Sequence, residues 1–335
     1  MIKKTAILLI NVGTPDKPEV KYVRRFLFQF LNDKRVIDLP WIFRKILVNL
    51  IIVPFRAYRS TKAYRLLWKS SGSPLIFYIN KLKVKLQKLL PDKFKVFVAM
   101  RYGKPSLKSA LNIINRGEFE KVIVLPMFPQ YASSTTGTIV ELIMNEISKW
   151  NIIPDIRFIN QFFNHKGFID AFAQRAVENR YKDYDHIIFS YHGLPMRQIQ
   201  KNHPEKNCNN CTCDIQMPEF GAYCYRATCY ETSRLLADKL QLTKETYTVA
   251  FQSRMSKNWL EPFSDRVIVE KAKEGIKKIL VLAPAFVADC LETEVEIGIE
   301  YAELFKNNGG EELTMAASLN DMDEWAETIK SFVTN

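Results

Sequence analysis

The chain has 335 residues, of which 47% are hydrophobic and 25% are charged, a composition typical of a soluble globular protein with more than one domain. The formal net charge of +12 favours an acidic partner, such as nucleic acid, anionic lipid or a substrate with carboxylates or phosphates. The lysines and arginines are spread without a long basic tract, so a solvated surface is the alternative explanation. Neither a P-loop pattern nor a G-x-G-x-x-G pattern occurs, which argues against a nucleotide-binding enzyme.

The first two apolar segments raise the question of membrane insertion. Two lysines precede the run 5–12 as in a signal peptide, but no small-residue cleavage site follows, and we expect a buried strand of a cytosolic protein. The segment 41–55 carries Arg44 and Lys45 and is shorter than the roughly 20 apolar residues that cross a bilayer. We expect an amphipathic helix there, which either packs in the core or forms an apolar lip that touches a membrane or a ligand.

Short apolar runs rich in β-branched residues recur along the chain and predict strands that are buried on both faces. These runs are 5–12, 95–100, 121–127, 186–191, 247–253 and 277–286. Stretches of helical periodicity lie between most of them, at 79–90, 106–116, 137–150, 167–179 and 226–240. This alternation predicts an α/β fold with doubly wound, Rossmann-like parallel sheets.

An internal echo indicates that the chain contains two similar halves. In both 7–15 and 187–195 a strand runs into the pattern x-Gly-x-Pro, and both 122–128 and 279–286 are strands that reach a proline-marked turn. We therefore expect two similar domains with an active-site cleft between them, because ligands of open α/β sheets bind outside the carboxyl ends of the strands.

The expected domain boundaries follow from this echo. The first domain comprises 1–128 plus 310–335, with the apolar lip at about 30–60 and a C-terminal helix. The second comprises 129–309 and contains a cysteine-rich insert at about 203–229.

The segment FSYHGLP places His192 at the end of a buried strand, directly before a glycine and close to a proline. An imidazole with an ordinary pKa of about 6.5, held there, is suited to act as a general base or a metal ligand; a structural turn residue is the alternative. His165, His186 and His203 have weaker contexts, and we expect surface or packing roles for them. His203 is an exception only as a possible zinc ligand.

Acidic residues open the helix that is expected after the last long strand. Asp289, Glu292 and Glu296 are spaced i, i+3 and i+7, so we expect them to share one helix face. A solvated helix N-terminus, favoured by the helix dipole, is one explanation. The other is a carboxylate row that accepts protons or holds a cation, which we favour because it follows the same kind of strand end as His192.

Five of the six cysteines lie within 208–229, in the pattern C-x2-C-x-C-x10-C-x4-C. Such a cluster in a cysteine-poor cytosolic chain indicates a metal site rather than disulfides. Four thiolates suit a 2Fe–2S cluster or a structural zinc ion, and the spacing does not decide which four take part. The cysteines are Cys208, Cys211, Cys213, Cys224 and Cys229.

Three further residues lie where the chain leaves expected strands. Arg101 and Tyr102 follow another strand, which suits them to a carboxylate and an aromatic face. Tyr131 lies on the Pro-, Ser- and Thr-rich loop 125–137.

With these segments the chain resembles the ferrochelatase family over nearly its whole length. The shared motifs, in order, are LLINVGTP, LPMFPQYASSTTG, SYHGLP, FQSR followed by WLEP, and PAFVADCLETEVEI. The resemblance implies a lyase that inserts Fe(II) into protoporphyrin IX, releases two protons and forms protohaem in the last step of haem biosynthesis. It also implies two α/β domains with the porphyrin between them.

The resemblance further implies roles for individual residues. His192 matches the family's invariant histidine, and Glu292 its metal-site glutamate, with Glu296 and Asp289 helping to hold Fe2+ or to pass protons. Arg101, Tyr102 and Tyr131 match porphyrin-contacting positions. Some relatives have a histidine where this chain has Cys290, so the role of that thiol stays open.

The resemblance also bears on cofactor, location and alternatives. Some members hold a 2Fe–2S cluster with differently placed cysteines, so we expect such a cluster here, with Cys208, Cys211 and Cys213 as ligands and Cys224 or Cys229 as the fourth. We expect a cytoplasmic protein without a nucleic-acid partner, peripheral on the inner face of the membrane through its lip. The alternatives are a chelatase for coproporphyrin or another tetrapyrrole, and a non-catalytic haem- or metal-binding protein.

Overall fold

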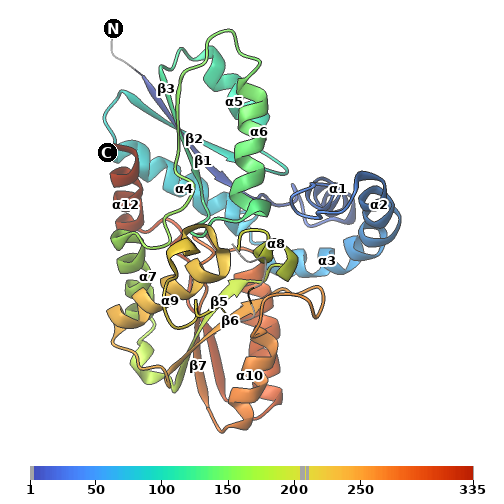
Figure 1. Ribbon diagram of the computed structural model, residues 1–335, viewed down its shortest axis with the longest axis vertical. Coiled ribbons are helices and arrows are strands. Elements are labelled where there is room, and N and C mark those ends of the chain that lie inside the picture. The colour runs from blue at the N-terminus through green and yellow to red at the C-terminus, as the bar shows by residue number, and fades with distance from the viewer. Residues whose placement is uncertain (1–3, 204–207, 209–210, 335) are drawn as a thin grey trace. The chain divides into compact units, whose positions relative to one another are not determined.

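The computed structural model describes residues 4–203, 208 and 211–334 (Figure 1). The chain divides into two compact units: unit 1 comprises 1–128, 132–161 and 326–335, and unit 2 comprises 129–131 and 162–325. Each unit is built on one four-stranded parallel sheet. The predicted α/β class with two similar parallel-sheet domains is therefore confirmed.

The sheet of unit 1 has the strand order β2-β1-β3-β4. Its strands are β1 (Thr5–Asn11), β2 (Phe94–Met100), β3 (Lys121–Pro126) and β4 (Asp155–Phe158). Every residue of β1 is buried, because this central strand is covered on both faces. One face packs against α5 (Leu107–Arg116) and α6 (Thr138–Ile147), seen beside the sheet in Figure 1.

Local signals set the ends of α5. The Ser106 hydroxyl accepts a hydrogen bond from the backbone N–H of Ser109 at 3.2 Å and so caps the helix N-terminus. Gly117 follows the last helical residue with a φ of −91°, and a Cβ there would lie 2.4 Å from Cε2 of Phe119. Leu107, Leu111 and Ile114 face the sheet and are nearly fully buried.

Four further helical segments precede β2 in unit 1. They are α1 (Val20–Leu31), the run α2 (Trp41–Ile46) with the π-helical η1 (Leu47–Ile52), α3 (Val53–Leu67) and α4 (Pro74–Leu89). The helix expected at 41–55 is confirmed, and with α1 and α3 it forms an arm that projects from the sheet of unit 1 (Figure 1). This arm leaves large apolar side chains exposed: Phe28, Trp41, Ile42, Phe43, Ile46, Leu50, Ile51, Phe55 and Tyr58. No described helix is both long enough and apolar enough to span a bilayer.

The sheet of unit 2 has the order β6-β5-β7-β8, which repeats the order of unit 1. Its strands are β5 (His186–His192), β6 (Tyr247–Gln252), β7 (Lys278–Leu282) and β8 (Glu312–Met315). Its longer helices are α7 (Lys166–Glu178), α9 (Tyr225–Leu240), α10 (Ser264–Lys273) and the π-helical η5 (Glu292–Tyr301). Shorter segments are η2 (Ser133–Gly137) in unit 1, and η3 (Tyr181–Asp183), α8 (Met196–Gln200), η4 (Glu219–Tyr223) and α11 (Ala302–Asn307) in unit 2; the division between the units falls within α12 (Asp323–Thr334).

The observed division differs from the expected domains at two segments. Residues 132–161 belong to unit 1, because β4 pairs with β3 in the first sheet. Residues 310–325 belong to unit 2, because β8 pairs with β7 in the second. Both strands have only four residues and leave half of their side chains or more at least partly exposed, so their sequences lack the apolar run that marks a central strand.

Candidate active site

His192 is the last residue of β5, and its surroundings define which ring nitrogen can accept a proton. Nδ1 lies 2.6 Å from the carbonyl oxygen of Gly193. Because a carbonyl oxygen only accepts hydrogen bonds, Nδ1 carries the hydrogen and Nε2 carries the lone pair. The hydroxyl of Tyr225 donates to the His192 carbonyl at 2.9 Å and holds the backbone at the strand end. The half-buried imidazole is therefore arranged as a proton acceptor at Nε2.

Gly193 allows the chain to leave β5 in close contact with β6. Its N–H donates to the carbonyl oxygen of Gln252 at 2.8 Å. A Cβ at this position would lie 2.9 Å from that oxygen and 3.3 Å from Cε3 of Trp259. There is thus no room for a side chain at this position. The rings of Trp259 and Phe286 flank His192, each with its centroid 6.4 Å from that of the imidazole.

Glu296 is held by donors from two directions. Its carboxylate accepts hydrogen bonds from the backbone N–H of Ser253 at 2.9 Å, from the Ser253 hydroxyl, and from the Tyr301 hydroxyl at 2.8 Å. Ser253 follows Gln252, whose register partner in β5 is His192. Its φ of +61° lies in the left-handed region, a strained conformation for a residue with a side chain that here aims both donors at Glu296.

The pKa of Glu296 shows which charges surround its carboxyl group. Burial raises this pKa most strongly, and the negative charge of Glu292 raises it further. The hydrogen bonds from Ser253 and Tyr301 and the positive charge of His192 oppose this increase. Glu292 and His192 therefore each lie within electrostatic reach of Glu296 in unit 2.

The helix that carries both glutamates is a π-helix, η5, rather than the expected α-helix. Its i→i+5 hydrogen-bond spacing brings Tyr301 next to Glu296, five residues earlier. Such π-helical turns are rare and frequently mark functional sites. Glu292, its first residue, contacts Cys290, a partly exposed residue whose thiol has a pKa raised by desolvation and then by the charge of Glu292.

Asp289 does not share a helix face with the two glutamates, and that expectation was wrong. It precedes η5 and is buried, with its carboxylate oxygens accepting from Ser318 N at 3.0 Å, Asn320 Nδ2 at 2.7 Å and Thr293 Oγ1 at 3.3 Å. Its own N–H donates to Asn320 Oδ1 at 2.9 Å. These contacts give Asp289 the task of holding the turn, and they lend no support to its expected part in iron binding.

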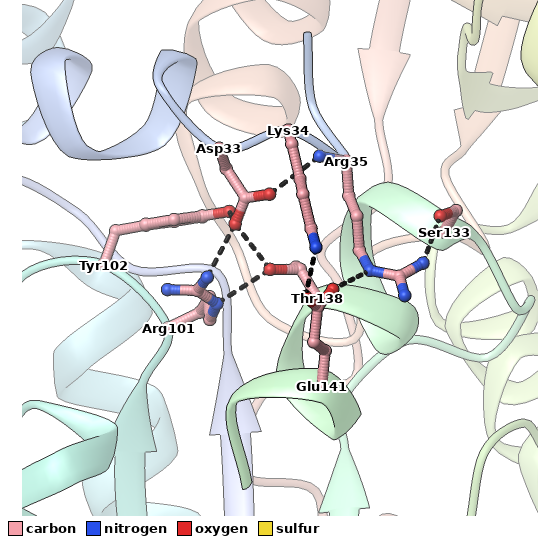
Figure 2. A network of polar contacts seen from close by, with 8 residues as sticks. All are labelled: Asp33, Lys34, Arg35, Arg101, Tyr102, Ser133, Thr138 and Glu141. Carbon is pink, nitrogen blue, oxygen red and sulfur yellow. Dashed lines mark hydrogen bonds and ion pairs between the residues drawn. The ribbon is translucent and has the colours of Figure 1, made fainter. Parts of the chain in front are cut away.

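Arg101 and Tyr102 lie in unit 1, directly after β2, and Figure 2 shows them bound to Asp33. Tyr102 is only 3% exposed, and burial together with the Asp33 charge raises its pKa. Tyr131 lies in unit 2 and is half-buried, with its ring edge-to-face against Tyr223 at 5.7 Å. Of the three expected porphyrin contacts, Tyr102 is therefore the one that is nearly fully buried, with its hydroxyl already donating to Asp33.

The cysteine-rich segment gathers its thiols in unit 2. The pKa values of Cys208, Cys213 and Cys224 are raised by burial first and then by neighbouring thiolates, Cys211 among them. Backbone N–H groups at the start of α9 hydrogen-bond to Cys224 and lower its pKa in part. Cys229, in α9, is fully buried. The donors therefore suit a metal chemically, although in 4–203, 208 and 211–334 no group of three or more His, Cys, Asp or Glu side chains is arranged as a metal site.

The other histidines have the contexts expected of packing residues, with one unusual case. His165 caps α7 by accepting from Gly167 N at 3.2 Å, and His186 contacts Thr248 Oγ1 at 2.9 Å. His203 is 7% exposed and lies edge-to-face on Phe220 at 4.7 Å. Both of its ring nitrogens are buried without a partner among the residues that the structure describes.

Ser253, Tyr301 and Asp33 were not among the site residues predicted from the sequence. Ser253 lies in the FQSR motif that supports the family resemblance, so a signal for it was present. Tyr301 contacts Glu296 through π-helical spacing, which a search for i, i+3 and i+4 neighbours does not consider. Asp33 lies far from its partners in sequence, and nothing local marks it.

The two units, each built on a four-stranded parallel sheet, define a protein of the chelatase fold. SirB from Bacillus subtilis with Fe3+ is similar in structure, with a TM-score of 0.57 at 10% identity over 99% of this chain and 94% of that one. The sirohydrochlorin chelatase SirB from Bacillus subtilis subspecies spizizenii in complex with cobalt gives a TM-score of 0.51 at 10% identity, over 96% and 92%. At such low identity these likenesses establish the fold alone.

Sequence comparison identifies the family. The model of the Ferrochelatase family matches residues 4–335. Ferrochelatase of Legionella pneumophila (strain Lens) is 42% identical over 98% of both chains, and that of Coxiella burnetii (strain Dugway 5J108-111) is 43% identical over 97% of this chain and 92% of the relative. The chain belongs to the ferrochelatase family, and it is a metal chelatase of the lyase class.

Proposed function

We propose that the chain inserts Fe(II) into protoporphyrin IX and releases the two inner protons, which yields protohaem in the last step of haem biosynthesis. Family membership over residues 4–335 is the observation that carries this proposal. The electrostatic influence of both His192 and Glu292 on Glu296 supports it, because metal insertion needs a proton acceptor and oxygen ligands that release iron readily.

His192 is the proposed base for the porphyrin N–H groups. Its Nδ1–H is committed to the Gly193 carbonyl, which leaves the Nε2 lone pair for an incoming proton. The resulting imidazolium is stabilised by the charge of Glu296, which also experiences the charge of His192. One proton can thus move from a pyrrole nitrogen to Nε2 without disturbing the hydrogen bond that orients the ring.

Glu292 and Glu296 are the proposed groups that receive Fe2+ and pass protons onward. Burial raises the pKa of Glu296, so this carboxyl group takes up a proton more readily than an exposed glutamate. Ser253 and Tyr301 keep it oriented. Carboxylate oxygens bind Fe(II) weakly compared with the four porphyrin nitrogens, so the metal can leave them. Iron is here a substrate, and the glutamates hold it only before insertion.

Arg101 and Tyr131 are the proposed porphyrin contacts, one in each unit. Among the residues that the structure describes, one nitrogen of the Arg101 guanidinium has no protein partner, which suits a ligand carboxylate. The Tyr131 ring, held by Tyr223, offers an aromatic face. Coproporphyrin carries more carboxylates than protoporphyrin, so the comparison of kcat/KM for the two substrates decides between them.

A 2Fe–2S cluster at the cysteine-rich segment is the proposed cofactor. Cys211 contributes to the raised pKa values of Cys208, Cys213 and Cys224, so these thiols lie near one another, and thiolates are the ligands of such clusters. Cys229 competes with Cys224 for the fourth place. A structural zinc ion is the alternative, and the ring nitrogens of His203, which have no hydrogen-bond partner within the described part of the chain, favour a Cys3His set for it. The absorption spectrum of the anaerobically purified protein distinguishes them, since only the cluster absorbs in the visible range.

Peripheral contact with the inner face of the membrane is proposed for the apolar arm of unit 1. Trp41, Phe43 and Phe55 are each more than half exposed, and such aromatic side chains insert readily into the interface of a bilayer. Lys45, which is partly exposed on the same arm, adds a basic charge. Co-sedimentation with anionic vesicles tests this contact, and cell fractionation tests the proposed cytoplasmic location.

Anaerobic incubation with protoporphyrin IX and Fe(II) tests the catalytic proposal. Loss of the free-porphyrin spectrum is expected for the wild type, and His192→Ala should lose about 100-fold or more in kcat while still binding porphyrin, since a general base contributes about that much. His165→Ala, a histidine outside the site, should retain activity and serves as the control. A non-catalytic metal-binding protein would instead leave the porphyrin unchanged in every variant and lose metal only with cysteine substitutions.

A further inference from the structure

Three consecutive residues of unit 1, Asp33, Lys34 and Arg35, connect the loop after α1 to two other parts of that unit (Figure 2). Lys34 Nζ lies 2.6 Å from Glu141 in α6, and Arg35 Nε forms an ion pair with the same carboxylate. Asp33 instead faces the end of β2 and the first residue of α6. Two carboxylates therefore organise this loop, and they have different partners.

Asp33 concentrates its contacts on one oxygen. Its Oδ2 accepts from Arg101 Nη2 at 2.6 Å, from Tyr102 OH at 2.9 Å and from Thr138 Oγ1 at 2.6 Å. Its Oδ1 accepts from the backbone N–H of Arg35 at 2.8 Å. The Asp33 side chain is 7% exposed, so the contacts are shielded from water and each is stronger than at the surface.

Arg101 is fixed at two of its three nitrogens. Nη2 donates to Asp33, and Nε donates to Thr138 Oγ1 at 2.9 Å. The guanidinium carbon lies 4.6 Å from the centroid of the Tyr102 ring, so the plane is also packed against an aromatic side chain. Nη1 has no protein partner among the described residues, and the side chain is 19% exposed. One edge of a rigidly held guanidinium is therefore left for another acceptor.

The Tyr102 hydroxyl is not available as a second donor for a ligand. Its hydroxyl already donates to Asp33, and the residue is nearly fully buried. Desolvation and the charge of Asp33 raise its pKa, so the hydroxyl stays a neutral donor at physiological pH. Tyr102 thus completes the support of Asp33, and Arg101 alone presents a free donor.

We propose that Asp33 is a positioning residue of the porphyrin subsite: it holds the Arg101 guanidinium so that Nη1 is presented to a carboxylate of the porphyrin. This inference rests on the proposed function. A guanidinium that is free to rotate loses conformational entropy when a ligand binds, whereas one already held by Asp33 and Thr138 does not. Asp33 therefore acts on porphyrin binding and leaves the proton-transfer step of unit 2 unchanged.

The test compares Asp33→Asn with Glu141→Gln, a matched change at the carboxylate that binds Lys34 and Arg35 and does not contact Arg101. Porphyrin binding is followed by quenching of intrinsic fluorescence, and insertion by steady-state kinetics. Asp33→Asn is expected to raise the Kd and KM for protoporphyrin about tenfold, with kcat within about twofold of the wild type. Glu141→Gln is expected to change neither constant by more than about twofold.

A double-mutant cycle separates positioning from general structural damage. In an Arg101→Met background, Asp33→Asn should have no further effect on KM, because its influence passes through the guanidinium. Far-UV circular dichroism checks folding, and Thr138→Val, which removes the acceptor of Arg101 Nε, replaces Asp33→Asn if that variant does not fold; its expected rise in KM is about threefold.

The outcomes distinguish failure of the proposed function from failure of the role of Asp33. If the wild type does not bind porphyrin, the proposed function fails and the inference fails with it. If the wild type binds and inserts iron while Asp33→Asn keeps its KM, or if the effects of Asp33→Asn and Arg101→Met are additive, only the role of Asp33 is refuted.

Discussion

Substitution of Asp289 separates a structural carboxylate from an iron ligand. Asp289→Ala leaves two buried donors without acceptors, the N–H of Ser318 and the amide of Asn320, and it leaves the Thr293 hydroxyl with only the Cys290 carbonyl as acceptor. An unpaired buried donor costs about 1–3 kcal/mol, and hydrogen bonds to a charged group lie at the upper end of that range. We expect Asp289→Ala to lower the free energy of unfolding by about 3–5 kcal/mol.

Asp289→Asn provides a sharper variant of the same size. Asn320 already directs its Oδ1 at the backbone N–H of Asp289 and its Nδ2 at the carboxylate, so it cannot turn its amide without losing one of these contacts. The new amide of residue 289 would keep one acceptor and place an N–H group against existing donors. The expected loss is about 2–3 kcal/mol, because roughly half of the acceptor capacity remains.

Urea unfolding followed by fluorescence measures both variants, with the midpoint and slope compared at equal protein concentration. Glu300→Ala, at an exposed position of the same π-helix, is the control and should change stability by less than about 0.5 kcal/mol. Unchanged stability of Asp289→Ala, combined with a loss of iron binding, would refute the structural role and support the part expected from the family resemblance.

Three other predictions concern pH, the π-helix and a glycine. Burial lowers the pKa of His186 from 6.5 to about 4, so the folded protein disfavours the charged imidazole. The free energy of unfolding should therefore keep the full contribution of neutral His186 above pH 6.5 and lose it as the pH drops toward 4. His186→Gln should remove this part of the pH dependence of the urea midpoint. Tyr301→Phe removes a hydrogen bond that lowers the pKa of Glu296, so the acid limb of the kcat/KM profile should move to higher pH; an unshifted limb would mean that Glu296 is not the titrating group. Gly13→Ala would place Cβ 1.8 Å from the Tyr102 carbonyl oxygen at a φ of +112°, and thermal melting should show a loss of more than about 3 kcal/mol; a stable variant would show that the β1 and β2 loops separate easily.

The fold class and most of the helices and strands could be predicted from the sequence alone. The β-branched runs became β1, β2, β3, β5, β6 and β7, because a central strand of a parallel sheet is buried on both faces and must be apolar at every position. β4 and β8 escaped prediction, since short and partly exposed strands lack that signal. His192 was recognised as a site candidate because a strand end, a glycine and a proline surround it in sequence.

The hydrogen-bond partners of each polar group could be identified only from the three-dimensional structure. The carboxylates at 289 and 296 look alike in sequence, yet one is enclosed by Asn320 and Ser318 and the other is oriented by Ser253 and Tyr301. Their partners come from other strand ends and from a π-helical turn, which a pattern of local spacing cannot encode. The physical reason is that hydrogen-bonding geometry and desolvation depend on groups brought together by the fold, whereas the sequence pattern reflects mainly which residues avoid water.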